Sequence, residues 1–150
     1  MVRDVTDKRP EYFEAILQLR EVSEEVFEYA QSELHKNGIH IAKIVPAENG
    51  YDLYTADSDF TKSLGRRIQE RFGGEYKISP MLFGRKDSRQ IYRLTILVRG
   101  VPFKRGDKVL YEGEEYIILM QGKEFMLQEI KTGKKIHLKY HESKRIKLVS

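Results

Sequence analysis

The chain has 150 residues, which is enough for one ordinary domain or for two small ones. Its mixture of 33% charged and 40% apolar residues is typical of a soluble globular protein with a core. The absence of cysteine excludes disulfides, thiol catalysis, iron–sulfur clusters and the usual structural zinc sites. No apolar run approaches the roughly 18 residues of a membrane span, and no signal-peptide core is present, so we expect a cytoplasmic protein.

The excess of positive charge lies in the last third of the chain. Residues 1–100 carry 16 basic and 16 acidic side chains, whereas residues 101–150 carry 11 basic and 7 acidic ones and account for the net charge of +4. The first 40 residues are acidic overall. A molecule with an acidic and a basic end can turn the basic end toward a polyanion. Ordinary solvated surfaces would give the same distribution of charged residues.

The first part of the chain alternates between strand and helix patterns. Residues 1–10 are polar and charged, and we expect them to form a flexible N-terminus. Apolar residues in 12–20 predict a strand, and after Ser23, a favourable N-cap residue, they recur with a helical period. Asn37-Gly38 is a typical helix end, and the alternation in 39–45 predicts the next strand.

A hairpin, a second helix and two further strands are predicted next. Asn49-Gly50 is a strong hairpin signal before a return strand over 51–57. Asp57 or Ser58 caps a helix that ends at Gly73-Gly74. The extended segments that follow are 75–84, in which Pro80 favours an edge strand or a bulge, and 89–99, the strongest strand pattern of the chain.

The order of these elements predicts an α+β domain over residues 11–99. The first six have the order of a ferredoxin-like split βαβ sandwich, and the extra last strand would lengthen an antiparallel sheet that two helices cover on one side. Another sheet order stays open, because sequence does not fix pairing. Residues 100–150 show four or five short strands with tight turns and at most one helical turn near 140–143, which predicts a small all-β SH3-like barrel.

Residues that suit catalysis or metal binding are scarce. His137 and His141 are four residues apart, but they lie in a strand-and-turn pattern, and no carboxylate at zincin spacing follows them. Asp52, Asp57 and Asp59 lack the spacing of a calcium loop, and a helix cap explains them more simply. We therefore expect no catalytic residue, no metal site and no cofactor.

Basic residues interleaved with aromatic ones are the richer signal. Lysines at a loop tip such as 131–135 can contact phosphates without base specificity, and arginines can bind them in a bidentate manner. Pairing with nearby acids is the alternative role of these side chains. The Lys/Arg-Gly-Phe pattern of RRM-type binders is absent, so we expect contacts to RNA backbone and shape. The candidate RNA-binding residues are Lys62, Arg66, Arg67, Arg71, Arg85, Lys86, Arg89, Lys104, Arg105, Lys131, Lys134, Lys135, Lys139, Lys144 and Arg145.

Four strings are distinctive in combination: YFEAILQLR (12–20), GYDLYTAD (50–57), RRIQERFGGEYKISPMLFG (66–84) and IYRLTILVRGVPFKRGDKVLYEGEEYIIL (91–119). Together they resemble the archaeal members of the nonsense-mediated-decay protein three family, whose eukaryotic members are the nuclear export adapter of the large ribosomal subunit. The resemblance extends from about Tyr12 to the end of the sequence. None of the four strings is a catalytic motif.

The resemblance implies a non-enzymatic protein that binds the large ribosomal subunit. It also implies that residues 101–150 are similar to the SH3-like half of the hypusine-bearing translation factor, and that the family occupies the tRNA-exit region of the subunit. Family members carry an N-terminal zinc-binding region with paired Cys-x-x-Cys motifs, and eukaryotic ones a C-terminal extension with a leucine-rich export signal. This chain has neither feature, so we expect a fragment or a shortened member, without a nuclear export role.

Three hypotheses about function follow, and the first is favoured. We expect a monomeric ribosome-associated factor that contacts rRNA and ribosomal proteins, with no membrane partner, in subunit biogenesis, quality control or recycling. The alternative is a protein–protein adapter without direct RNA contact, and an RNA-modifying or RNA-cleaving enzyme is the weakest hypothesis. The adapter would use the barrel or the acidic side chains of the first helix, Glu21, Glu24, Glu25, Glu28 and Glu33.

Overall fold

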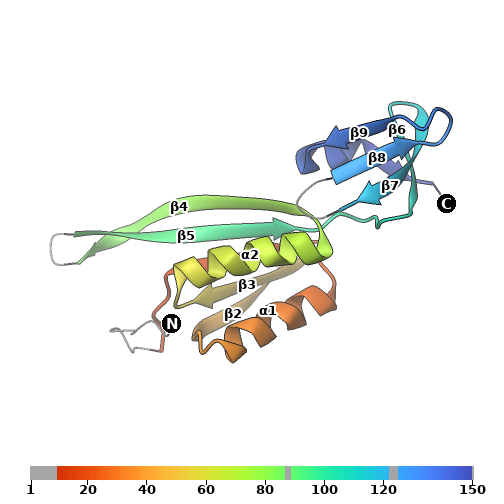
Figure 1. The fold of residues 1–150 in the computed structure, drawn as a ribbon. Coiled ribbons are helices and arrows are strands. Elements are labelled where there is room, and N and C mark those ends of the chain that lie inside the picture. Colours follow the sequence, from red (N-terminus) through yellow and green to blue (C-terminus); the bar gives the residue numbers. More distant parts are fainter. Residues whose placement is uncertain (1–9, 87–88, 122–124, 150) are drawn as a thin grey trace.

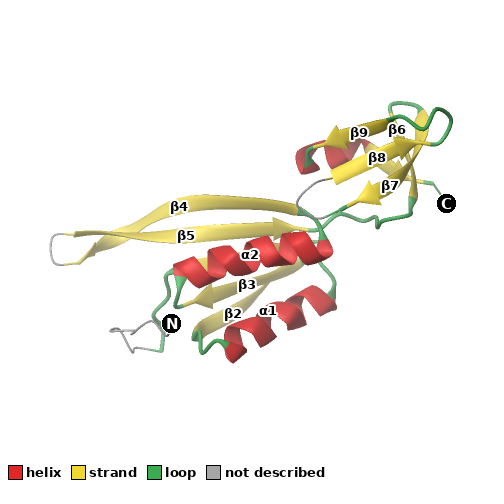
Figure 2. Cartoon of the chain, in the orientation of Figure 1, coloured by secondary structure: helices red, strands yellow, loops and turns green. Residues whose placement is uncertain are grey.

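The computed structural model describes residues 10–86, 89–121 and 125–149, with the backbone alone for 82–92. The chain forms two five-stranded sheets, and two helices pack on one face of the first sheet (Figures 1 and 2). This arrangement confirms the predicted α+β class. The elements of the first sheet are β1 (Ala15–Arg20), α1 (Glu24–Lys36), β2 (Ile41–Ala47), β3 (Gly50–Thr55), α2 (Ser58–Phe72), β4 (Glu75–Lys86) and β5 (Arg89–Arg99).

The strand order of the first sheet is β2-β3-β1-β5-β4. The expectation of an antiparallel sheet that the last strand lengthens was wrong, because β5 lies inside the sheet and runs parallel to β1. Leu17 in β1 is opposite Leu53 in β3 and Ile96 in β5, and all three side chains are buried. The apolar β5 suits this central position. Its partner β4 takes the edge of the sheet, as Pro80 indicated.

The two helices pack on the central strands through apolar stripes with a helical period. From α1 the buried side chains are Val26, Ala30 and Leu34, and from α2 they include Leu64 and Ile68. Both helices begin where the sequence predicted. Of the two caps considered for α2, Asp57 is the one used: its Oδ1 accepts a hydrogen bond of 2.9 Å from the Phe60 amide.

The second sheet has the order β10-β6-β7-β8-β9, and all of its strand pairs are antiparallel. The short strands and the helical turn predicted near 140–143 are therefore present. The turn is a 3-10 helix, η1. The elements are β6 (Lys108–Tyr111), β7 (Glu114–Met120), β8 (Phe125–Glu129), β9 (Lys135–Leu138), η1 (Tyr140–Arg145) and β10 (Ile146–Leu148).

Three stacked aromatic rings organise the core of the second sheet. The ring centroids of Phe103 and Phe125 are 5.5 Å apart, and those of Phe125 and Tyr140 are 5.1 Å apart, with interplanar angles of 20° and 21°. Phe103 and Phe125 are buried, whereas Tyr140 is half-buried. The stack joins the connector before β6, the start of β8 and the start of η1.

The two sheets meet where α2 ends. A Cβ atom at Gly73 would lie 3.1 Å from Cβ of Gln121, so the end of β7 comes close to the end of α2. The Gln121 amide donates a hydrogen bond to the carbonyl of Phe103. Within the described ranges, no helix is both long and apolar enough to cross a membrane.

Candidate nucleic-acid interface

Two of the four basic side chains predicted on α2 form ion pairs with acids. Nζ of Lys62 lies 3.5 Å from Oδ1 of Asp59, one turn earlier in the helix. Nη1 of Arg67 lies 2.8 Å from Oε1 of Glu33 and therefore links α2 to α1. These carboxylates neutralise part of the positive charge that would otherwise attract a phosphate.

The other two arginines of α2 are exposed and lie over tyrosine rings. The Arg66 guanidinium is 4.9 Å from the ring centroid of Tyr76, and that of Arg71 is 5.0 Å from the centroid of Tyr29. Neither arginine forms an ion pair with any residue that the structure describes. A cation–π contact orients the guanidinium plane, and a planar guanidinium suits a bidentate phosphate contact. Arg66 also forms a hydrogen bond with the Tyr76 hydroxyl.

The environment of Tyr76 explains why Arg66 is held in this position. Burial raises the pKa of the Tyr76 phenol, and the positive charge of Arg66 opposes this change. The hydroxyl donates a hydrogen bond of 3.1 Å to the Lys62 carbonyl, so the ring lies along α2. A neutral ring anchored at its hydroxyl end gives the guanidinium a fixed face to pack on.

Three lysines occupy the tip of the β8–β9 hairpin. Lys131, Lys134 and Lys135 are all exposed. Local hydrogen bonds order the tip: the Gly133 amide donates to the Glu129 carbonyl at 2.9 Å. No lysine of the tip forms an ion pair within the described part of the chain. The tip therefore presents positive charge on an ordered turn, which suits contacts with a phosphate backbone.

The remaining candidates are dispersed. Lys104, Arg105 and Lys144 are exposed. Arg145 forms an ion pair of 3.0 Å with Glu112. The side chains of Arg85, Lys86 and Arg89, also predicted to bind RNA, lie outside the described residues.

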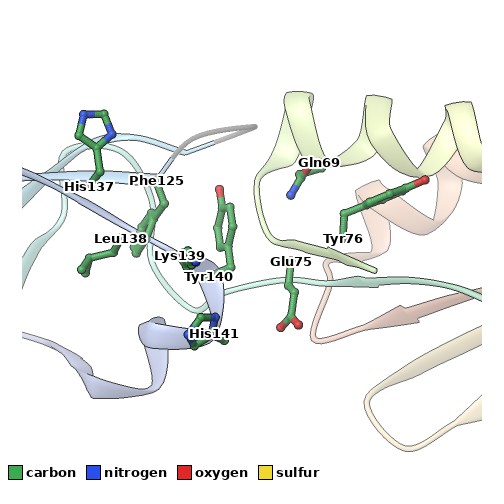
Figure 3. A pocket seen from close by; sticks show the side chains of 9 residues that line it. All are labelled: Gln69, Glu75, Tyr76, Phe125, His137, Leu138, Lys139, Tyr140 and His141. Carbon is green, nitrogen blue, oxygen red and sulfur yellow. The ribbon is translucent and has the colours of Figure 1, made fainter. Parts of the chain in front are cut away.

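Lys139 is brought close to the first sheet by the fold. It precedes η1, and its amide donates a hydrogen bond of 3.1 Å to the Glu142 carboxylate. It lines a cavity of about 450 Å³ between the two sheets, together with Gln69 at the end of α2 and Tyr140 in η1 (Figure 3). Sequence reasoning identified Lys139 but not Gln69 or Tyr140, although the interleaved basic and aromatic residues of KYHESKR were a signal.

His137 and His141, considered from sequence only as metal ligands, line the same cavity. Among the residues that the structure describes, no group of three or more potential ligands is placed to hold a metal ion. The acids Asp52, Asp57 and Asp59 have other contacts: Asp52 pairs with Arg20, Asp57 caps α2 and Asp59 pairs with Lys62.

Comparison with protein families identifies the first part of the chain. The family model described as NMD3, second domain, matches residues 12–99, which is more than half of the chain and comprises the first sheet with both helices. No curated protein matches the sequence.

Proposed function

This chain belongs to the NMD3 family, and on that premise we propose that it is a non-enzymatic factor that binds the large ribosomal subunit, during its biogenesis or quality control. The observation that carries the proposal is the family match over residues 12–99. The proposal treats the protein as a cytoplasmic monomer whose partners are rRNA backbone and ribosomal proteins. The cations on α2 and on the β8–β9 hairpin that pair with no described acid support it, because ribosomal RNA is a dense polyanion.

The same proposal includes the finer structural assignments. Residues 11–99 would be a ferredoxin-like sandwich with β5 inserted between β1 and the edge strand, and residues 100–150 an SH3-like barrel. Two observations support this division: each sheet has its own cluster of buried apolar side chains, and only the first lies in the family match. Residues 1–10 would be a flexible N-terminus.

We expect the basic residues to contribute unequally to RNA binding, because their surroundings differ. Arg66, Arg71 and the lysines of the hairpin tip would contact phosphates directly, since no described acid neutralises them. Arg67 and Arg145 would contribute less, because binding RNA would require them to leave Glu33 and Glu112. Exposed ion pairs are weak, so this cost is modest.

Co-sedimentation with purified large and small ribosomal subunits across a salt series tests the proposal. We expect selective, salt-sensitive binding to the large subunit. Reversing the charge at Arg66 and Arg71, or at Lys131, Lys134 and Lys135, should abolish it. Lys36→Glu is the matched control, since this exposed lysine lies on the acidic helix α1. Absence of binding at low salt, or equal binding of all variants, would contradict the proposal.

A protein–protein adapter is the second candidate, and an apolar surface favours it. Leu110 in β6 and Ile117 in β7 are large aliphatic side chains, and they are 39% and 37% exposed. Acidic side chains of α1 offer a second docking face for a basic protein. Binding through the apolar surface should change little with salt, whereas rising salt, from dilute to physiological, should weaken binding through about six phosphate contacts by orders of magnitude.

A further inference from the structure

Side chains of the second sheet alternate between a buried face and an outer face. Val109, Ile118 and Leu127 belong to the buried core of this sheet. Their neighbours in the same strands lie on the opposite side, which we call the outer face, because side chains alternate along a strand. The apolar side chains of the outer face are Leu110, Ile117, Met120, Met126 and Ile130.

Four of these five side chains are well exposed. Leu110 and Ile117 are 39% and 37% exposed, and Met120 and Ile130 are 43% and 46% exposed. The solvent face of an antiparallel sheet is normally polar. A single exposed aliphatic side chain is ordinary, but adjacent ones with a polar rim are typical of a protein interaction site. Whether these side chains are adjacent therefore decides what the outer face can do.

The strand register joins them into one patch around Ile117. Leu110 in β6 is opposite Glu115 in β7, and the Ile130 amide donates a hydrogen bond of 3.0 Å to the Glu115 carbonyl from the other side. Two residues further along β7 is Ile117, and beyond it Met120 is opposite Met126 in β8. Two strand residues span about 7 Å, so the patch extends about 14 Å along β7.

Lysines lie on both sides of this apolar patch. Lys108 and Lys147 flank it in β6 and β10, and Lys135 flanks it in β9. All three are exposed. Glu115 is the one acid among the described strand residues of the outer face, and its Oε2 lies 2.8 Å from Nζ of Lys108. Within the described ranges, Lys135 and Lys147 form no ion pair.

An acidic amphipathic helix matches both the length and the charge of the outer face. A helix rises about 14 Å in roughly nine residues, and apolar residues at i, i+3 or i+4 and i+7 would form a stripe of that length. Carboxylates beside such a stripe would meet the lysines. RNA matches less well, because the apolar centre offers nothing to a phosphate.

The acidic helix of a second copy of this chain is not a suitable occupant. α1 carries several exposed glutamates, but its apolar stripe of Val26, Ala30 and Leu34 is buried against its own sheet. It therefore has no apolar face to offer to Ile117. The helix that docks on the outer face must come from another protein.

We propose that the outer face of the second sheet docks an acidic amphipathic helix of a partner protein, an inference that goes beyond RNA binding. The apolar stripe of the helix packs on the patch around Ile117. Its carboxylates pair with Lys108 and Lys147 on one side and with Lys135 on the other. The exposed apolar surface thereby has one occupant of defined chemistry.

The test uses the whole chain and three fluorescein-labelled model peptides of about 18 residues, rich in alanine to favour a helix. The first has a leucine stripe flanked by glutamates, the second the same stripe flanked by lysines, and the third the composition of the first in scrambled order. Anisotropy should show that the first binds at least about tenfold more tightly than the others. Equal binding of the first peptide and either of the others, or no binding of the first, would overturn the inference.

Substitutions of the apolar patch locate the binding. Leu110→Gln combined with Ile117→Gln should weaken binding of the glutamate-flanked peptide about tenfold or more, because it removes two apolar contacts. Val45→Gln is the matched control: Val45 is 37% exposed, as Ile117 is, but lies in β2 of the first sheet. Equal effects of the double variant and the control would exclude the outer face.

A charge exchange gives a second readout that keeps the apolar patch intact. Lys108→Glu combined with Lys147→Glu should weaken binding of the glutamate-flanked peptide and strengthen binding of the lysine-flanked one. This result is expected even if the double glutamine variant fails to fold. Lys36→Glu combined with Lys77→Glu changes the net charge equally at exposed positions of the first sheet and its helix, and should reverse no preference. An unchanged preference in the Lys108 and Lys147 variant would contradict the docking model.

RNA on the outer face is one outcome of the same series. Labelled hexauridylate should bind the double glutamine variant as it binds the unmodified chain. Weaker hexauridylate binding by this variant, together with no binding of the glutamate-flanked peptide, would assign the face to RNA and overturn the inference.

Failure of the docking inference and failure of the proposed function give different results. If the chain sediments with the large subunit but binds no model peptide, the docking inference fails and the proposed function stands. If the glutamate-flanked peptide binds as expected but the chain does not sediment with subunits, the ribosomal proposal fails instead.

Discussion

The ring of Tyr76 packs directly against the backbone of Gly65. A Cβ atom at position 65 would lie 2.7 Å from Cε2 of that ring and 2.9 Å from Cγ2 of Ile96. The helix α2 can therefore approach β4 and β5 closely because residue 65 has no side chain. The same contact holds the Tyr76 ring in place beneath Arg66.

This contact predicts an unusual effect of a helix-favouring substitution. Gly65→Ala gains up to about 1 kcal/mol of helix propensity, but the added methyl group overpacks the site and should cost roughly 1–3 kcal/mol. We expect a net loss of stability in urea denaturation. Ser63→Ala, at an exposed position of the same helix, should be neutral or slightly stabilising. Equal stability of Gly65→Ala and Ser63→Ala would mean that α2 is not packed this closely.

Three tyrosines should ionise at a higher pH than a free phenol. Burial raises the pKa of Tyr76, Tyr111 and Tyr116 above the usual 10.0, and Glu112 or Glu129 nearby adds to the effect at the last two. In a titration of absorbance at 295 nm, these three tyrosines should ionise above pH 10. Tyr116→Phe should remove one late-titrating group. A single transition near pH 10 would contradict this expectation.

The raised tyrosine pKa values also predict the direction of alkaline destabilisation. Below pH 10 the phenols are neutral in the folded and the unfolded chain, so their ionisation does not affect stability. Above pH 10 the unfolded chain releases these protons more readily, and stability falls as the pH rises through the folded-state pKa values. Thermal melts at pH 9 and pH 11 should show the loss, and it should be smaller in a protein with Tyr111→Phe and Tyr116→Phe.

The ion pair of Arg20 with Asp52 should stabilise the fold more than any exposed pair. Its atoms lie 2.7 Å apart, the side chains are only 19% and 18% exposed, and Arg20 also donates to the carbonyls of Leu19 and Tyr51. We expect Asp52→Ala to cost about 1–3 kcal/mol, against less than about 1 kcal/mol for Asp59→Ala, which removes the more exposed pair with Lys62. Equal costs in urea denaturation would contradict this ranking.

Substituting single lysines by alanine should distinguish lysines that contact a phosphate from lysines that are only solvated. If Lys134 contacts one phosphate, Lys134→Ala should lower the slope of log K against log salt by about 1 for binding to the large subunit. Lys62→Ala should change the slope less, because Asp59 already offsets that charge. The slopes come from the same co-sedimentation series, and an unchanged slope for Lys134→Ala would remove the hairpin tip from the interface.

Local patterns predicted most elements of the fold, whereas pairing between distant strands could not be predicted. Asn49-Gly50, the Asp57 cap and Pro80 each act within a few residues, and the hairpin, the start of α2 and the edge position of β4 agree with them. The insertion of β5 beside β1 joins residues about 80 positions apart, such as Leu17 and Ile96. Nothing local encodes that choice, because β5 would suit any central position of a sheet.

In the candidate site too, the residue types could be predicted from local sequence, whereas contacts between distant residues could not. Sequence reasoning selected basic residues by type and could not see that Arg67 pairs with Glu33, 34 residues away, or that Arg145 pairs with Glu112. It also found Lys139 without its neighbours in the cavity, because Gln69 and Tyr140 meet only through the packing of one sheet against the other. Whether the selected residues bind RNA stays a prediction.

The pairing of β10 with β6 has a consequence for how the chain folds during its own synthesis. Ile146 is opposite Tyr111, so the first and last strands of the second sheet are neighbours. The first sheet is complete once Arg99 is available, and it can fold as soon as that residue leaves the ribosomal tunnel. The second sheet must wait until Leu148 emerges, and until then the strand edge of β6 lacks its partner. A nascent chain halted between these two points would carry a folded first half and an unfinished second one.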